Sequence, residues 1–405
     1  MTIRARRWEL PGIDDLTKEQ DAVLALPTNG RHLVIGGPGT GKTVVCLLRA
    51  RRHAREGDDY TFLVWNHLLK RASESLFNGE FRANTWHSWF GTQFRVRFRK
   101  NPPKLLPSEG TTWRPIDWPE VRRLIGSLPE ESGPGHLPLL VIDEGQDMPP
   151  DFYDSLNQLG FEHIFVAADQ NQQINDQNSS LKELKDSLCV DGDDVIELTY
   201  NHRNRYSIAR LARQFYTGDP ASPPPDLPPR DDTIYTPRLH YMDEATMPRI
   251  ARSILRHWDH NPRRLVGVIA PNNKVRRGYF DAIRSEASTL TLDNGTPEIQ
   301  TFYGRHRPDV RFEQGGILVI NAQACKGLEF DTVVLADIDQ HLVAETDLDR
   351  TRKLFYVMVS RARRRVAMFM NRNGRSAIEA ILPKDPRILR REDVAGRATH
   401  REEGR

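Results

Sequence analysis

The stretch RHLVIGGPGTGKTVVCLLRARRHAR, residues 31–55, decides the fold of this chain. Residues 31–36 predict a short buried strand that runs into a glycine-rich turn, and residues 44–55 predict the helix that follows. Between them GGPGTGKT, residues 36–43, fits the pattern G-x-x-x-x-G-K-[ST] in the strand–turn–helix context that this pattern needs. The alternative is a glycine-rich turn without a ligand, and the flanking strand and helix argue against it.

The residue types in this loop suit the binding of a nucleoside triphosphate. Glycines let backbone amides turn toward phosphate oxygens at the start of a helix, where the partial positive charge favours anions. Lys42 is expected to contact the β- and γ-phosphates, and Thr43 is expected to ligate magnesium. We therefore predict ATP and Mg²⁺ as cofactors. The nucleotide-binding residues expected in the loop are Gly36, Gly37, Gly39, Thr40, Gly41, Lys42 and Thr43.

A second motif, LLVIDEGQD at residues 139–147, places two carboxylates at the end of a hydrophobic strand. In a parallel sheet that strand end faces the phosphate loop. Asp143 is expected to hold magnesium through water, and Glu144 to orient and deprotonate the attacking water. Acidic residues at a strand end are often only solvated turn residues, but their spacing behind a phosphate loop favours the catalytic interpretation.

Further apolar runs extend the alternation of strands and helices along the chain. They predict strands at 61–65, 137–143, 163–169, 264–271, 316–322, 332–338 and 365–370, with a helix around 350–363. This order indicates an α/β fold with two parallel, doubly wound sheets. The expected domains are residues 1–200 with a short basic and aromatic insertion at about 90–136, residues 201–383 with a proline-rich connector at 217–230, and a charged tail at 384–405.

Composition narrows the class of protein. The chain of 405 residues is long enough for two cores, and no run approaches the ~18 apolar residues of a membrane helix. The N-terminal sequence MTIRARRWELPG lacks a signal-peptide core, so we expect a cytoplasmic protein with no membrane partner. Cys46, Cys189 and Cys325 form no CxxC pair, which argues against a disulfide framework or a zinc site. A net charge of +3 does not by itself indicate a nucleic-acid partner.

The motifs GGPGTGKT and DEGQD, together with several further motifs in the same order along the chain, resemble those of the UvrD/Rep branch of superfamily 1 DNA helicases. Gln20 in LTKEQDAVL resembles the family's glutamine that reads the adenine edge. Asp169 and Gln172 in AADQNQQI resemble the D-x-x-Q sensor that couples the γ-phosphate to the DNA groove. The resemblance implies two RecA-like domains of the P-loop NTPase type that close on one nucleotide.

Three segments of the second half complete the resemblance. Asn201-His202-Arg203 matches the family's N-Y-R motif, which implies that Arg203 reaches the γ-phosphate. KGLEF at 326–330 implies that Glu329 lies near the nucleotide sugar or its phosphates. YVMVSRAR at 356–363 implies that Arg361 is the arginine finger, although RARRR could equally be a solvated basic face.

The chain also departs from the family pattern. Val44 replaces an arginine that follows the loop threonine, and His202 replaces the tyrosine that stacks on adenine, so we expect weaker selection of adenine. Asn175 replaces an aromatic residue. Only about 50 residues separate WHSWF from the DEGQD strand, so the inserted subdomains of the family are shortened or missing. Compact relatives occur as partners of nucleases, including in antiviral defence, and that analogy suggests a nuclease or another protein subunit as a partner.

Candidate contacts to nucleic acid lie in the first half. Trp65 stands where the family has a base-contacting phenylalanine, and Thr85 and His87 resemble a segment that touches the DNA backbone. Residues 90–104 interleave phenylalanines with basic residues, among them Arg95, Arg97 and Arg99. This pattern is typical of a surface that holds phosphates and bases, and equally of a half-buried strand; both interpretations stay open.

The resemblance implies an ATP-dependent translocase or helicase on single-stranded DNA that moves 3′ to 5′. Two other functions fit the same sequence. One is a regulatory NTPase subunit that switches a partner nuclease without processive unwinding. The other is an RNA-directed helicase, because nothing in the sequence reads or excludes a 2′-hydroxyl.

Overall fold

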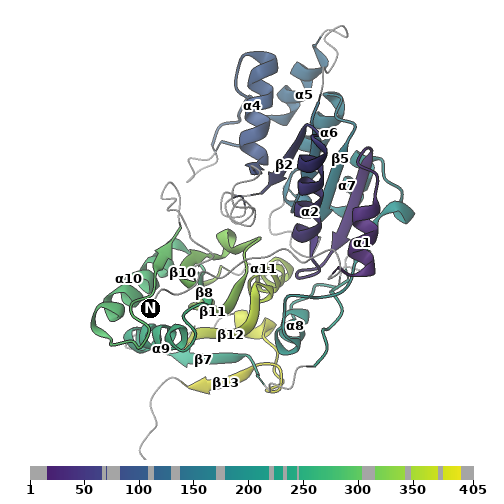
Figure 1. Cartoon of the computed structure of the whole chain (residues 1–405). Coiled ribbons are helices and arrows are strands. Elements are labelled where there is room, and N and C mark those ends of the chain that lie inside the picture. The colour runs from purple at the N-terminus through teal and green to yellow at the C-terminus, as the bar shows by residue number, and fades with distance from the viewer. Residues whose placement is uncertain are drawn as a thin grey trace, which may run out of the picture. The chain divides into compact units, whose positions relative to one another are not determined.

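The computed structural model describes residues 16–65, 70, 83–107, 114–128, 137–169, 178–218, 223–230, 235–243, 246–302, 315–342, 348–372 and 377–393. The chain divides into two compact units. The P-loop unit comprises Glu9–His202 and Gly218–Asp226, and the C-terminal unit contains Arg203–Thr217 and Leu227–Arg405. Each unit is built on one parallel sheet covered by helices (Figure 1).

The sheet of the P-loop unit has six strands in the order β3-β2-β4-β5-β1-β6, and all of its pairs are parallel. The longer strands lie where apolar runs predict them, whereas β3 and β6 are too short to leave such a run. The strands are β1 (Arg31–Gly36), β2 (Tyr60–Val64), β3 (Ala83–Thr85), β4 (Leu139–Ile142), β5 (Ile164–Ala168) and β6 (Ile196–Leu198).

Helices cover both faces of this sheet. Along β1, Leu33 and Ile35 pack on one core and Val34 on the other. A strand buried on both faces is apolar at every position, which explains its continuous apolar run. Val34 faces α1 (Lys18–Ala25) and α2 (Lys42–Glu56). The opposite core includes α4 (Trp86–Phe98), α5 (Trp118–Gly126), α6 (Pro150–Gln158) and α7 (Leu181–Leu188).

The segment 90–104 begins in a helix, so its interpretation as a half-buried strand is wrong. Phe90, Phe94 and Phe98 recur every fourth residue and therefore share one face of α4. Phe90 and Phe94 are 1% exposed, and Phe98 packs against the same core. Burial of these rings outweighs the strand-like alternation that the sequence shows.

The C-terminal unit contains a seven-stranded sheet in the order β13-β7-β12-β11-β8-β10-β9, again with parallel pairs. The two parallel sheets confirm the predicted α/β fold class. The strands are β7 (Arg238–Met242), β8 (Leu265–Ala270), β9 (Ile299–Thr301), β10 (Gly316–Asn321), β11 (Phe330–Leu335), β12 (Ala362–Asn371) and β13 (Arg390–Asp393).

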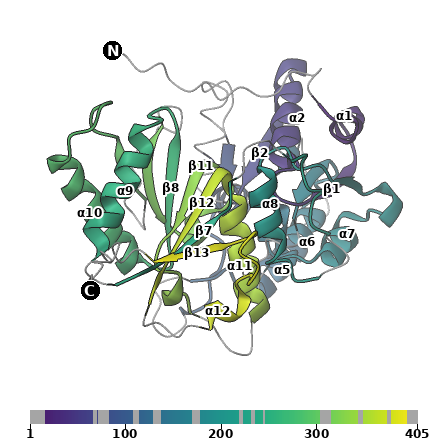
Figure 2. The same cartoon turned by 90° about the horizontal axis from the view of Figure 1, so that it is seen from below.

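Each face of this second sheet is covered by two helices. On one face α9 (Met247–Asp259) and α10 (Asn273–Thr289) pack together over β8, β10 and β11. On the other face α8 (Tyr206–Arg213) and α11 (Leu348–Ser360) pack near β12 (Figure 2). The remaining short elements are α12 (Ile378–Ile381) and the 3₁₀ turns η2 (Gly145–Asp147), η4 (Gly192–Asp194), η7 (Ala322–Cys325) and η8 (Ile338–Gln340).

The expectation of a loose charged tail from residue 384 is wrong as far as residue 393. Ile388 and Leu389 are buried, and the following residues Arg390–Asp393 pair as β13 with the edge strand β7. Two apolar side chains anchor the segment, and the free edge of β7 supplies the backbone partners. Within the described residues no helix is both long and apolar enough to cross a membrane.

Candidate functional site

The phosphate loop leaves β1 at Gly36 and enters α2 at Lys42. Gly39 and Gly41 have φ angles of 86° and 94°. These angles lie in the left-handed region that favours glycine, so the turn requires glycine there. The loop places the first amides of α2 at the carboxyl end of the sheet, where an anion binds most favourably.

Two neighbours lie close to the glycines of the loop. A Cβ on Gly37 would lie 2.3 Å from the ring of Pro225, and a Cβ on Gly41 would lie 2.3 Å from Nε2 of Gln20. Pro225 belongs to the proline-rich segment 217–230, whose Asp226 N–H donates to the Thr199 carbonyl at 2.8 Å. Pro225 therefore lies against the phosphate loop, and the Asp226 hydrogen bond fixes the backbone beside it.

The ammonium of Lys42 lies inside the loop and is buried. Its Nζ donates to the carbonyl oxygens of Gly36 at 2.7 Å and Gly37 at 2.9 Å. The carboxylate of Asp169, directly after β5, lies 3.4 Å away. A cation held here is positioned to neutralise phosphate oxygens.

Thr43, near the start of α2, and Asp143, directly after β4, bring two possible oxygen ligands for a metal ion together. The Thr43 hydroxyl donates to Asp143 Oδ2 at 2.8 Å. Burial and the neighbouring carboxylate of Glu144 raise the pKa of Asp143, while Thr43 and Lys42 lower it only in part. Hydroxyl and carboxylate oxygens are the ligands that Mg²⁺ prefers, and a divalent cation would offset the burial of two acids. These residues therefore fit the predicted magnesium.

Gln146 orients Glu144, a role that the sequence argument had not assigned. Its Nε2 donates to Glu144 Oε2 at 2.7 Å, and its Oε1 accepts from the backbone N–H of Asp169 at 2.8 Å. The side chain is fully buried and joins the end of β4 to the end of β5. The glutamine of the motif DEGQD indicates this role, because a buried amide between two strand ends can form a hydrogen bond to each of them.

Gln20 and His202 lie at the same loop. Gln20 caps α1, and its Nε2 donates to the Thr40 carbonyl at 3.1 Å. The backbone N–H of His202 donates to the Gly39 carbonyl at 2.9 Å. The centroid of the Tyr200 ring lies 4.6 Å from the centroid of the His202 ring. Sequence comparison with the family missed Tyr200, which adds an aromatic surface next to the histidine.

The motifs of the C-terminal unit meet around one carboxylate. Arg203 Nη2 lies 2.6 Å from Glu329 Oε1. Burial raises the pKa of Glu329, but Arg203, Arg363 and Arg361 outweigh it and lower that pKa below its ordinary value. The Arg361 side chain also donates from Nε to the Val357 carbonyl at 3.1 Å. The three predicted motifs thus form one charged cluster.

Asn204 fixes the backbone of this cluster, a role that no sequence motif indicates. Its Nδ2 donates to the carbonyl oxygens of Ser360 at 3.0 Å and Ala362 at 2.5 Å. These carbonyls flank Arg361, whose own carbonyl accepts from the Phe330 N–H at 2.9 Å. Asn204 therefore helps to hold Arg361 in place.

The predicted nucleic-acid residues of the P-loop unit do not form one continuous surface. Trp65 packs on the hydrophobic core and stacks on Trp86 with ring centroids 6.3 Å apart. Thr85 is buried at the start of α4. His87 is half-buried, and burial, with a smaller effect of Lys104, lowers its pKa. The rings of Trp65 and His87 are both partly exposed.

The three arginines of α4 and its end also point to different neighbours. Arg95 donates to the Asn101 side chain at 3.0 Å, and Arg97 donates to the Leu159 carbonyl at 3.5 Å. Arg99 caps the helix in a left-handed conformation. Because the phenylalanines between them are buried, this segment offers cations without the aromatic faces that we expected. The predicted sensor glutamine Gln172 and Asn175 lie outside the described residues.

A phosphate loop, a buried acidic strand end and two parallel sheets define a P-loop NTPase. Two family models match parts of the chain. A model described as an AAA domain matches residues 19–177, and a model described as a UvrD-like helicase C-terminal domain matches residues 316–369. These matches confirm the resemblance to UvrD-like helicases and support an ATP-driven helicase enzyme.

The chain is also similar to two solved structures. The chain is similar to the C-terminal domain of a possible DNA helicase from Lactobacillus plantarum WCFS1, with a TM-score of 0.32, 14% identity, and coverage of 47% of this chain and 97% of that one. It is also similar to the DUF1998 helicase MrfA bound to DNA, with a TM-score of 0.45, 13% identity and 89% of this chain covered. The match spans 49% of the MrfA chain. No curated protein matches the chain.

We predict that Gln146→Ala lowers turnover by roughly 10–100-fold, as expected when a group that orients a catalytic residue is removed. Nucleotide affinity should change much less, because Lys42 and the loop amides remain. Loss of two buried hydrogen bonds should also reduce the free energy of unfolding by about 1–3 kcal/mol. Steady-state ATPase assays, a nucleotide-binding titration and urea unfolding measure the three effects. The exposed Gln340, which donates to Asp337, provides the matched control Gln340→Ala.

Proposed function

We propose that the chain is an ATP-dependent translocase on single-stranded DNA that moves 3′ to 5′. The observation that carries the proposal is the pair of charged constellations. The P-loop unit holds Lys42, Thr43 and Asp143 with Glu144 beside them. The C-terminal unit gathers Arg203 and Arg361 around Glu329. The first suits the binding and cleavage of a triphosphate, and the second suits stabilisation of the charge that develops during cleavage.

In the P-loop unit each residue has a distinct task. ATP bound with Mg²⁺ would supply the phosphoanhydride bond. Lys42 would neutralise phosphate oxygens, and Thr43 with Asp143 would hold the metal ion. Glu144, kept in place by Gln146, would orient a water and accept its proton.

The arginines of the C-terminal unit would complete the site by closure of the two units. A guanidinium stabilises the developing γ-phosphate charge only when it reaches the phosphate, so hydrolysis would be tied to a domain movement. Asn204 and Glu329 keep both arginines preorganised, which reduces the entropy lost on closure.

A regulatory NTPase that switches a partner nuclease is the second candidate. One observation favours it: the rings of Phe90 and Phe94 are buried, while the apolar side chains of Val96 and of Leu106, which follows the segment 90–104, are 68% and 80% exposed. Exposed apolar side chains at these two positions suit contact with a protein partner more than stacking with bases. The two candidates share the same nucleotide chemistry.

A polymer panel separates these candidates. For a DNA translocase we expect ATP hydrolysis to rise at least about tenfold with single-stranded DNA, and much less with duplex DNA or RNA, because one strand must thread the site to complete it. Equal stimulation by RNA of the same length would favour the RNA-directed helicase. Hydrolysis that no polymer changes would contradict the translocase and favour the regulatory NTPase. Directional displacement of a protein block from either end of a strand measures polarity.

We expect Lys42→Ala and Glu144→Gln to abolish turnover in different ways. Loss of the Lys42 ammonium removes a phosphate contact, so ATP binding should weaken. Glu144→Gln keeps the size of the side chain but removes the base, so ATP should bind and remain uncleaved. A fluorescent ATP analogue measures binding, and phosphate release measures cleavage. Near wild-type hydrolysis by Glu144→Gln would show that another group activates the water.

Arg361→Ala should lower hydrolysis by roughly 10³-fold or more, with a far smaller change in ATP affinity, as expected for an arginine finger. The control is Arg372→Ala, because Arg372 is exposed on the same unit and pairs with Asp393. Melting curves of both variants exclude unfolding as the cause. If Arg361→Ala retained full turnover while folded, the proposal that both units act on one nucleotide would fail.

A further inference from the structure

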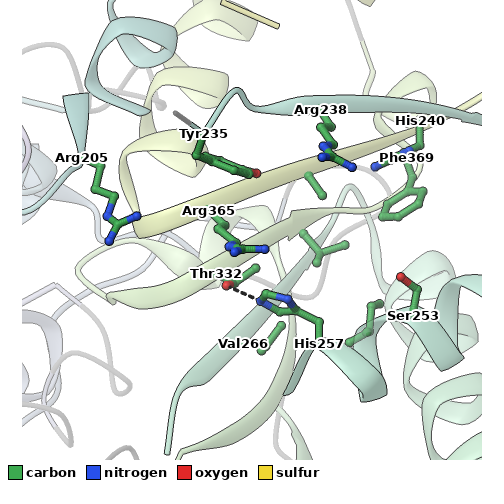
Figure 3. A pocket seen from close by; sticks show the side chains of 13 residues that line it. Arg205, Tyr235, Arg238, His240, Ser253, His257, Val266, Thr332, Arg365 and Phe369 are labelled. Atoms are coloured by element: carbon green, nitrogen blue, oxygen red, sulfur yellow. Dashed lines mark hydrogen bonds between the residues drawn. The ribbon is translucent and has the colours of Figure 1, made fainter. Parts of the chain in front are cut away.

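The C-terminal unit contains a cavity of about 440 Å³ that none of the helicase motifs uses. It lies beside α9, over the strands β7, β8, β11 and β12 (Figure 3). All thirteen side chains that line it belong to the C-terminal unit, so the cavity is separate from the phosphate loop.

The lining of this cavity is strongly cationic. It includes Arg205, Arg238 and Arg365, and none of the described residues that line it is acidic. The Arg365 guanidinium lies 5.5 Å from the centroid of the Tyr235 ring, and no carboxylate of the described residues pairs with it. Arg238 and His240 lie 3.3 Å and 3.9 Å from the carboxylate of Glu392, which lies outside the described lining.

This positive charge lowers the pKa values of neighbouring basic groups. His257, whose Nε2 is 2.8 Å from the Thr332 hydroxyl, has a pKa of about 4 because burial and then Arg365, Arg264 and His260 disfavour its charged form. At neutral pH His257 therefore carries no charge. Burial and the charges of Arg364, Arg365 and Arg205 also lower the pKa of Arg264, and Asp331 offsets this effect only in part. The cavity thus places the positive charge of Arg365 beside the guanidinium groups of Arg205 and Arg238.

We propose that this cavity is a second ligand site, which binds the phosphoryl group of a small molecule or of a strand end. Guanidinium groups match phosphate oxygens with paired hydrogen bonds. The hydroxyl of Ser253, which also lines the cavity, adds a further donor. A phosphoryl group carries about −1.5 to −2 charges, so it balances several arginines better than one carboxylate does. The volume of 440 Å³ lies within the range of roughly 300–1,000 Å³ for small-molecule pockets.

Arg365 is the residue that tests this site. Calorimetric titration of the full chain with pyrophosphate should reveal two sites, one at the phosphate loop and one in the cavity. Arg365→Gln should weaken the cavity site by about tenfold or more, the loss expected for one charge-assisted contact, and leave Mg²⁺–ATP binding unchanged. Arg365→Lys should bind pyrophosphate in the cavity with intermediate affinity, because lysine keeps the positive charge but cannot form the paired hydrogen bonds of a guanidinium. Lys42→Ala should weaken only the loop site.

The matched control is Arg390→Gln, because Arg390 lies on the neighbouring β13, is exposed and pairs with Glu392 at 3.0 Å. It should change the cavity affinity by less than about twofold. Competition then identifies the source of the phosphoryl group. Displacement by a mononucleotide supports a small ligand, and displacement by a 5′-phosphorylated but not a 5′-hydroxyl tetranucleotide supports a strand end. A single pyrophosphate site that Lys42→Ala removes would overturn the proposal, as would equal affinity of the cavity for glutarate.

Discussion

The buried ammonium of Lys42 is the constraint on which the P-loop unit depends. A charge in a site that excludes water needs partners, and Lys42 finds them in two loop carbonyls and the carboxylate of Asp169. The backbone N–H of Asp169 in turn donates to Gln146, which holds Glu144. One chain of contacts therefore runs from the phosphate loop through β5 to the acidic end of β4. A change at any member alters the position of the others.

The parallel sheet makes this chain of contacts possible. In such a sheet the carboxyl ends of all strands lie along one edge, so residues distant in the sequence meet there. Lys42 follows β1, Asp143 follows β4 and Asp169 follows β5, and these strands are neighbours in the order β4-β5-β1. Crowding at the same edge explains Gly37, because the ring of Pro225 leaves no space for a Cβ, and the left-handed φ angle of 94° explains Gly41.

The sequence predicts the parts of this structure that depend on local pattern. Continuous apolar runs identify the long strands, and the glycine-rich turn identifies the phosphate loop with Lys42 and Thr43. The missed features depend on tertiary contacts instead. Leu389 holds β13 to the sheet, and Pro225 packs on the loop from a segment that its composition marks only as a connector. The alternation in residues 90–104 misled the strand interpretation, because the fourfold spacing of its phenylalanines fits a helix face better.

The basic run RARRR at 361–365 shows why a sequence cannot assign every charge to one function. Either an arginine finger or a solvated basic face would account for it. In the structure the arginines of this run lie in two different places. Phe330 pairs with Ala362 but Thr332 pairs with Arg365, so β12 has one more residue than β11 between these pairs. An extra residue of this kind changes which way the following side chains point. Arg361 and Arg363 accordingly lie near Glu329, whereas Arg365 lines the cationic cavity beside α9. A single irregularity in strand pairing thus lets one short run contribute to two separate charged sites.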